Sequence, residues 1–214
     1  METVAQKVRR LKAEETIRDR QIKKLQRRLA AVRSRRAKVA AAIVRWTKSV
    51  KQIKRPFEVH VWNVANQSDR IGGEKAISLI VVHDTEGGTI DGIHSWFNNP
   101  RSLASSHVLV DKDGASVQFV PDARKAWHVM AFNSRALGIE QIGFATQDSW
   151  PEQQLIKTAE YIAYWSRKYG IPITHSTSHG VCQHKDLGVA GGGHDDCGPA
   201  YPFAHVLALA RAMR

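Results

Sequence analysis

Residues 184–199 concentrate side chains that bind metal ions. These sixteen residues include two histidines, three aspartates, one cysteine and five glycines. A catalytic zinc ion takes three protein ligands through nitrogen, sulfur or carboxylate oxygen and leaves a fourth position to water. His184 and Asp196 stand twelve residues apart, and the glycines between them permit a loop that brings both to one ion, because glycine adopts backbone conformations that other residues avoid. The segment therefore predicts two ligands of a zinc site.

A third ligand must come from elsewhere in the chain, and His83 is the best upstream donor. It directly follows the apolar run 77–82, whose β-branched residues are typical of a buried strand. Strand ends are rigid positions that suit functional side chains. A histidine in this place is more often an ordinary hydrogen-bonded residue than a ligand, so the strand alone leaves both interpretations open.

Six segments together resemble a known family. They are 81–85 (VVHDT), 105–114 (SSHVLVDKDG), 120–122 (VPD), 126–128 (AWH), 137–140 (LGIE) and 193–199 (GHDDCGP). In this order they resemble the motifs of type 2 N-acetylmuramoyl-L-alanine amidases, within the amidase and peptidoglycan recognition protein superfamily. The resemblance extends from residue 77 to residue 203.

The resemblance implies a ligand set for zinc. In the family, the histidine that closes the first strand and the histidine that opens the final loop bind Zn²⁺, which points to His83 and His184. The third ligand is the aspartate of an Asp-Pro-Gly-Pro segment, which corresponds to Asp196. Here the following proline is replaced by Cys197. Some relatives use a cysteine as the third ligand, so Cys197 competes with Asp196, although Asp196 holds the aligned position.

The resemblance also implies two catalytic residues. Glu140 corresponds to the glutamate that acts on the zinc-bound water, and a carboxylate can take the proton of a water whose pKa zinc lowers to about 7. His194 stands two residues before Asp196, where relatives carry a lysine or histidine that stabilises the oxyanion. A donor in that place stabilises charge that develops only in the transition state.

Four further residues are candidates for contact with the substrate. Trp127 and His128 resemble the Trp-His pair that lines the substrate site of relatives, and Asn133 lies where relatives often contact the peptide stem. A buried aromatic residue with a hydrogen-bonded neighbour is the alternative interpretation. His107 lies within an expected strand and belongs either to the cleft wall or to the core.

The remaining pattern predicts an α/β domain over residues 77–214, with a mixed central β-sheet flanked by helices and a zinc cleft. The expected elements are strands at 77–82, 106–110, 116–120 and 137–142 and helices at 91–98, from 152 to about 170 and at 203–213. Asp113-Gly114 marks a hairpin turn, and Ser149 with Glu152 forms an expected capping box. Residues 56–76 are expected to be a linker that includes a short strand at 57–62.

Residues 1–55 differ sharply from the rest of the chain. They hold 19 Lys and Arg against 4 Asp and Glu, so they carry all of the net positive charge of +12. Steps of four and three residues from Val4 to Ile53 meet an apolar residue at twelve of fifteen positions, and no glycine or proline occurs before Pro56. A sustained 3.5-residue repeat predicts a long coiled-coil-like helix that pairs with another helix. We therefore expect a possible homo-oligomer.

The basic helix has three possible roles. It is a solvated stalk, a site that docks on anionic cell-wall polymers, or a site for nucleic acid or an anionic membrane. Sequence-specific nucleic-acid binding usually comes with a recognisable motif, and the chain has none. Anionic wall polymers fit an attached amidase best.

The sequence as a whole contains no apolar run of the roughly 20 residues that a membrane span needs. The first residues lack the apolar core and cleavage site of a secretory signal, so we expect no signal peptide and synthesis in the cytoplasm. Reduced thiols are the expectation for Cys182 and Cys197 in that compartment.

These observations predict a zinc-dependent N-acetylmuramoyl-L-alanine amidase that cleaves between N-acetylmuramic acid and L-alanine in peptidoglycan. A phage endolysin that stays in the host cytoplasm until release and then acts on the wall fits the absence of a signal, although a bacterial autolysin or a prophage remnant would show the same features. The alternative is a non-catalytic peptidoglycan-binding module that its coiled coil oligomerises to raise avidity. The presence of all three ligand types and of Glu140 argues against that alternative.

Overall fold

The computed structural model describes residues 3–52 and 55–214, and the chain divides into two compact units, Met1–Gln52 and Ile53–Arg214. The first unit is a single helix, α1 (Val4–Gln52), so the expected long helix is confirmed. Its described apolar seam is open to solvent: Ile22, Leu25, Leu29 and Val32 are each half exposed or more. Self-association along this seam stays a prediction. Ile53 and the side chains of Val8, Leu11, Val39, Ile43, Trp46 and Val50, which belong to the expected seam, lie outside the described residues.

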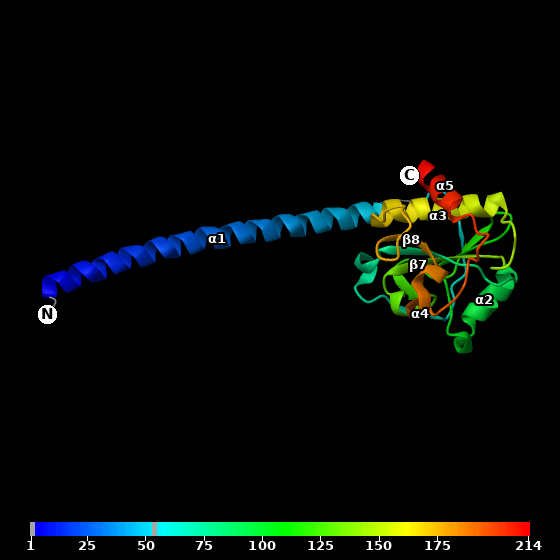
Figure 1. Cartoon of the computed structure of the whole chain (residues 1–214), viewed down its shortest axis with the longest axis horizontal. Coiled ribbons are helices and arrows are strands. Elements are labelled where there is room, and N and C mark those ends of the chain that lie inside the picture. Colours follow the sequence, from blue (N-terminus) through cyan, green and yellow to red (C-terminus); the bar gives the residue numbers. More distant parts are fainter. Residues whose placement is uncertain (1–2, 53–54) are drawn as a thin grey trace. The chain divides into compact units, whose positions relative to one another are not determined.

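The second unit is built on a six-stranded sheet with the order β1-β5-β4-β7-β3-β8 (Figure 1). The strands are β1 (His60–Val61), β3 (Leu79–Val82), β4 (Val108–Val110), β5 (Ser116–Gln118), β7 (Ala136–Gln141) and β8 (Gly180–Gln183). Strands β4, β7, β3 and β8 run parallel, whereas β5 is antiparallel to β4 across the expected hairpin. All of β3 is buried, which explains its unbroken apolar sequence, since a strand covered on both faces needs no polar side. The mixed sheet is confirmed.

Helices cover this sheet. Helices α3 (Glu152–Tyr169) and α5 (Phe203–Ala212) pack against each other, and Figure 1 shows them together on one side of the sheet, with α2 (Ile90–Asn98) on the other. The short helices are η1 (Gly73–Ala76), η2 (Pro100–Ser102), η3 (Met130–Phe132), η4 (His184–Leu187) and α4 (Gly188–Gly191).

The start of α3 differs from the prediction. Pro151 in extended conformation is the N-cap residue, so Ser149 stands too far back for the expected capping box with Glu152. At the other end, Gly170 caps the helix in the left-handed conformation, at φ 69°, as a C-terminal glycine does.

Residues 56–76 belong to the second unit, and the structure does not make them a linker. Strand β1 pairs with β5, and β2 (Gln67–Asp69) pairs antiparallel with β6 (Arg124–Ala126). Arg70, directly after β2, is only 5% exposed. Strand β1 lies within the short strand expected at 57–62, whereas β2 and β6 have three residues each, too few to show a period of two, so the sequence pattern did not reveal them.

No helix in the described part of the chain is both long enough and apolar enough to cross a bilayer.

Candidate metal centre and active-site cleft

Three neighbouring parallel strands bring the candidate residues to one edge of the sheet. Val82 of β3 lies opposite Ile139 of β7 and Gln183 of β8. The next residue on each strand is therefore at the same level, which places Glu140, His83 and His184 side by side. Ligands of open α/β sheets bind at these carboxyl ends of the strands.

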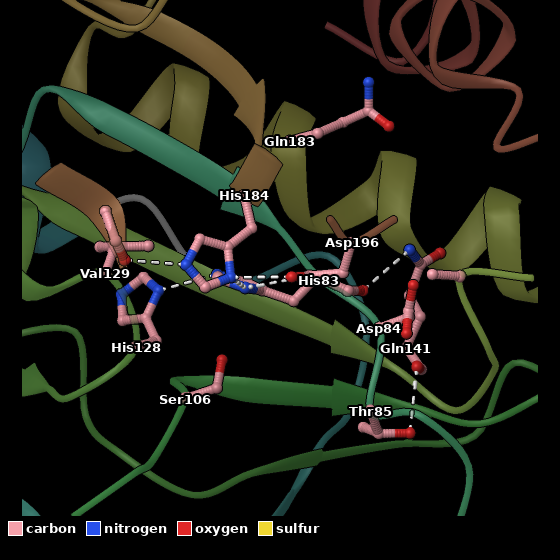
Figure 2. A network of polar contacts seen from close by, with 12 residues as sticks. His83, Asp84, Thr85, Ser106, His128, Val129, Gln141, Gln183, His184 and Asp196 are labelled. Atoms are coloured by element: carbon pink, nitrogen blue, oxygen red, sulfur yellow. Dashed lines mark hydrogen bonds and ion pairs between the residues drawn. The ribbon is translucent and has the colours of Figure 1, made fainter. Parts of the chain in front are cut away.

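Asp196 reaches the same point from the loop that follows α4. The backbone N–H of Lys185 donates to the carbonyl oxygen of Asp196 at 2.9 Å, which ties the returning loop to the residue after His184. Figure 2 shows His184 and Asp196 directed toward His83, with His128 beyond the histidine pair. All three donor residues are buried.

The two histidines present the same ring nitrogen to this point. Nε2 of His184 donates to the carbonyl oxygen of Gly191 at 2.9 Å, and Nε2 of His83 lies 2.9 Å from Nδ1 of His128. The carbonyl acceptor makes Nε2 of His184 a donor, and a proton on Nε2 of His83 would likewise leave Nδ1 of both rings free to bind a cation. Metal-binding histidines are commonly held by such hydrogen bonds of the other ring nitrogen.

The donor atoms lie close enough to share one ion. His83 Nδ1 is 3.0 Å from His184 Nδ1 and 3.2 Å from Asp196 Oδ2, and His184 Nδ1 is 2.9 Å from Asp196 Oδ1. In a tetrahedral zinc site with bonds of about 2.0–2.1 Å, neighbouring ligand atoms are about 3.3 Å apart. Three buried donors of the types that zinc prefers therefore fit the ion.

Burial and mutual contact set the charges of these donors. Burial lowers the pKa of His83, against the opposing hydrogen bond and charge of Asp196. Burial alone would lower the pKa of His184 as well, but the hydrogen bond and the charge of Asp196 outweigh it and raise that pKa above its ordinary value. Burial would raise the pKa of Asp196, yet its hydrogen bonds with His184 and His83 hold that pKa below the ordinary value. Asp196 is therefore a carboxylate, the form that binds a cation.

Glu140 lies beside the donors with one oxygen unpaired. The residue is 8% exposed, and Oε2 is buried without a hydrogen-bond partner. Burial, followed by the charges of Asp196 and Asp84, raises the pKa of Glu140 well above the ordinary value. A buried carboxyl group without a protein partner is costly to keep, which favours a functional reason for its presence.

His194 lies in the same cleft. Its ring stacks on that of His184, with centroids 4.6 Å apart and an angle of 23° between the planes. His194 is exposed to solvent and lines both the main cleft and a smaller adjoining pocket. The imidazole can therefore reach a molecule bound over the metal centre.

The cleft has a volume of about 520 Å³, and one wall comes from the segment after β6. Trp127, His128 and Asn133 all line it. The indole N–H of Trp127 donates to Ser68 at 3.0 Å, and Oδ1 of Asn133 accepts from the backbone N–H groups of His128 and Val129.

Gly138 of β7 makes room for the His128 ring. A Cβ atom on Gly138 would lie 2.7 Å from Nδ1 of His128, a contact that real side chains do not make. The glycine thus lets His128 stand against the sheet and reach His83.

Comparison with known proteins decides the family. The family described as N-acetylmuramoyl-L-alanine amidase matches residues 73–199, more than half of the chain. The chain belongs to this amidase family. N-acetylmuramoyl-L-alanine amidase A of Achromobacter lyticus is 36% identical over 90 residues, which are 42% of this chain and 50% of that protein. The match therefore spans half the length of this curated relative.

Solved structures share the fold at low identity. The Staphylococcus aureus hydrolase AmiA, in complex with its ligand, has a TM-score of 0.60 at 20% identity, covering 77% of this chain and 87% of that one. The endolysin amidase LysCS of Clostridium intestinale has a TM-score of 0.54 at 19% identity, covering 72% and 95%.

His107 does not line the cleft. It is fully buried, its Nδ1 accepts from the backbone N–H of Gly138 at 3.0 Å, and its Nε2 lies 2.9 Å from the guanidinium of Arg70. Burial and the nearby Arg70 charge lower its pKa to about 3, so the ring is neutral. Of the two interpretations that the sequence left open, the structure places His107 in the core, because both ring nitrogens face protein groups.

The structure brings Asp196, and not Cys197, to the histidine pair. Within the described residues, His83, His184 and Asp196 are the group that lies close enough to hold an ion. Cys197 is fully buried, and burial, with the charge of Asp196, raises the pKa of its thiol well above the ordinary value. Cys182 and Cys197 are both free thiols, as expected.

Sequence reasoning missed the apolar rim of the cleft. Trp96, Leu103 and Met130 line it and are 54%, 70% and 69% exposed. They come from α2, the residue after η2 and the start of η3. Large apolar side chains are rarely left together in water without a reason. In α2, Trp96 stands directly before Phe97, and the helix buries Phe97 while Trp96 stays exposed, so the sequence alone did not distinguish the two aromatic residues.

Proposed function

We propose that this chain is a zinc-dependent hydrolase of the amide bond between the lactyl group of N-acetylmuramic acid and L-alanine in peptidoglycan. The observation that carries the proposal is the meeting of three metal-binding donors with the unpaired carboxyl group of Glu140 in one cleft of an amidase-family chain. A bound zinc ion supplies a Lewis acid and makes water a usable nucleophile near neutral pH.

The chain's own residues carry the proton transfers. Glu140 takes a proton from the attacking water and returns it to the amine of L-alanine as the amide bond breaks. The imidazole of His194 donates a hydrogen bond to the carbonyl oxygen, where negative charge develops. His128 holds His83 in the tautomer that leaves Nδ1 free.

The full-length protein, with its zinc content measured, should release peptides that begin with L-alanine from purified peptidoglycan. New amino termini identify the bond, and the absence of new reducing sugar ends excludes cleavage of the glycan. Zinc without release from several wall types would make the chain a recognition module, and a protein that takes up no zinc would contradict the ligand assignment.

We further propose that the chain acts as a phage endolysin, made in the host cytoplasm and acting on the wall after release. The endolysin fold of LysCS supports this proposal.

We propose that α1 docks the enzyme on anionic polymers of the cell wall. Residues 18–38 are all exposed, and residues 20–38 hold nine Lys and Arg and no Asp or Glu. At 3.6 residues per turn, Arg20, Lys23, Lys24 and Arg27 lie on the face opposite Ile22, Leu25 and Leu29. The cationic face is therefore available to a polyanion even if the apolar seam pairs with another helix.

Changing these four cations to glutamine should weaken binding to walls that retain their anionic polymers by about tenfold or more at low salt, with the difference shrinking as salt rises. Co-sedimentation of the full chain with the wall measures this. The matched control changes Lys75, Arg101, Lys112 and Arg214 to glutamine, which removes the same charge from the second unit. Equal loss in the control, or unchanged binding to walls stripped of anionic polymers, would contradict the proposal.

A further inference from the structure

Arg70 is a buried cation outside the metal centre that the proposed chemistry does not use. It follows β2, and 5% of its surface is exposed. Burial lowers its pKa to about 10, so the guanidinium remains charged at neutral pH. An arginine in such a place requires partners for its N–H groups, because an unpaired buried charge is strongly destabilising.

Its partners are backbone carbonyl oxygens on both sides of the cleft wall. Before Trp127, the guanidinium donates to the carbonyls of Asp122 at 3.3 Å and Arg124 at 2.8 Å. After it, the guanidinium donates to the carbonyls of Asn133 at 3.2 Å, Ser134 at 2.9 Å and Ala136 at 3.2 Å.

The segment that these contacts enclose is largely irregular. Between β6 and β7 it contains only the single turn η3. Irregular backbone leaves carbonyl groups without ladder partners, and buried carbonyls need donors. The planar fork of arginine offers five N–H groups and can satisfy several carbonyls at once, which a lysine cannot.

Arg70 also connects this segment to the sheet. The carbonyl oxygen of Arg124, which accepts from Arg70, also accepts at 3.3 Å from Nε2 of His107, whose other nitrogen accepts from the N–H of Gly138 on β7. The enclosed segment in turn places His128 at 2.9 Å from the zinc-ligand candidate His83.

We propose that Arg70 is a positioning residue that sets the substrate-binding wall formed by residues 122–136. It clamps both ends of the wall and thereby fixes Trp127, His128 and Asn133 relative to the metal centre. The expected effect on substrate binding rests on the proposed function, whereas the hydrogen bonds by which Arg70 holds residues 122–136 do not.

The test compares Arg70→Lys and Arg70→Met with the wild type in the full-length, zinc-loaded protein. Hydrogen exchange is followed at the amides of Trp127, His128 and Val129, which donate to Ser105 and Asn133. Both variants should speed exchange at these amides by about tenfold or more, with Arg70→Lys the milder, because each lost hydrogen bond contributes modestly and several are lost. Exchange in β3 and α3 should stay within about twofold of the wild type.

With a soluble peptidoglycan fragment as substrate and zinc at a saturating concentration, Arg70→Lys should raise KM by about tenfold while kcat changes little, since binding contacts are displaced and Glu140 is not. Arg124→Met is the matched control, because its guanidinium lies on the same segment but pairs with Gln67 and the exposed Asp69. It should leave exchange at Trp127, His128 and Val129 near the wild-type rate.

Three outcomes would overturn the proposal. They are unchanged exchange at these three amides in Arg70→Lys, equally faster exchange in β3 and α3, and a fall in kcat with KM unchanged. If the wild type cleaves no substrate, the proposed function fails, and the exchange measurements still decide whether Arg70 holds the wall.

Discussion

The Glu140→Gln variant is expected to bind zinc as the wild type does and to lose release of peptides from peptidoglycan. The rate should fall by about 10²- to 10⁴-fold, which is the usual contribution of a positioned general base. Glutamine keeps the size and hydrogen-bonding shape of glutamate but cannot take a proton. Because burial and the charges of Asp196 and Asp84 disfavour the carboxylate, the zinc-free variant should also unfold at a temperature no lower than that of the zinc-free wild type.

The control for this experiment is Glu160→Gln on α3, where the carboxylate pairs with Lys157 at 2.5 Å and does not line the cleft. It should retain wild-type release. Zinc content by elemental analysis and release by counting new L-alanine amino termini separate a catalytic defect from a folding defect. Residual activity of Glu140→Gln within about threefold of the wild type would exclude a general-base role, because it corresponds to under 1 kcal/mol of barrier.

The candidate metal centre was predictable because its residues combine a rare chemistry with strong local patterns. His83 ends an apolar run whose length and β-branching mark a buried strand, and the glycines between His184 and Asp196 indicate a loop that returns on itself. Parallel pairing explains how the site is assembled. Strands β7 and β8 pair with β3, one on each side, and bring Glu140 and His184 level with His83. The sequence motifs indicated which residues to choose, and the register explains why they meet.

Arg70 and Ser68 could not be found in the same way. They lie in a polar stretch without periodicity. Their roles depend on hydrogen bonds with carbonyl and indole groups more than 50 residues away in the chain. The role of His107 also depended on tertiary contacts, since a histidine in a strand gives no sign of which face it takes. The predicted start of α3 was wrong for a local reason. Pro151 is the N-cap residue, so Ser149 lies too far before the helix to form a capping box with Glu152.

The second prediction concerns the third zinc ligand. Asp196→Asn should lower zinc affinity by at least about 100-fold, since the loss of a direct ligand should exceed the 10- to 100-fold that loss of a supporting hydrogen bond typically costs. Asparagine keeps the shape of the side chain but removes the charge that pairs with His83 and His184. Cys197→Ala should retain zinc, because the thiol lies outside the donor group.

Thermal unfolding with and without added zinc gives an independent measure. A cation that binds only the folded state at 100 times its Kd stabilises it by about 2.7 kcal/mol, so zinc should raise the melting temperature of the wild type and of Cys197→Ala. Zinc should not raise that of Asp196→Asn, while Asp195→Asn, at the exposed neighbouring residue, should respond as the wild type does. The opposite pattern, with zinc lost in Cys197→Ala and kept in Asp196→Asn, would make the cysteine the ligand. The loop after α4 would then have to turn Cys197 toward His83 and His184 when zinc binds.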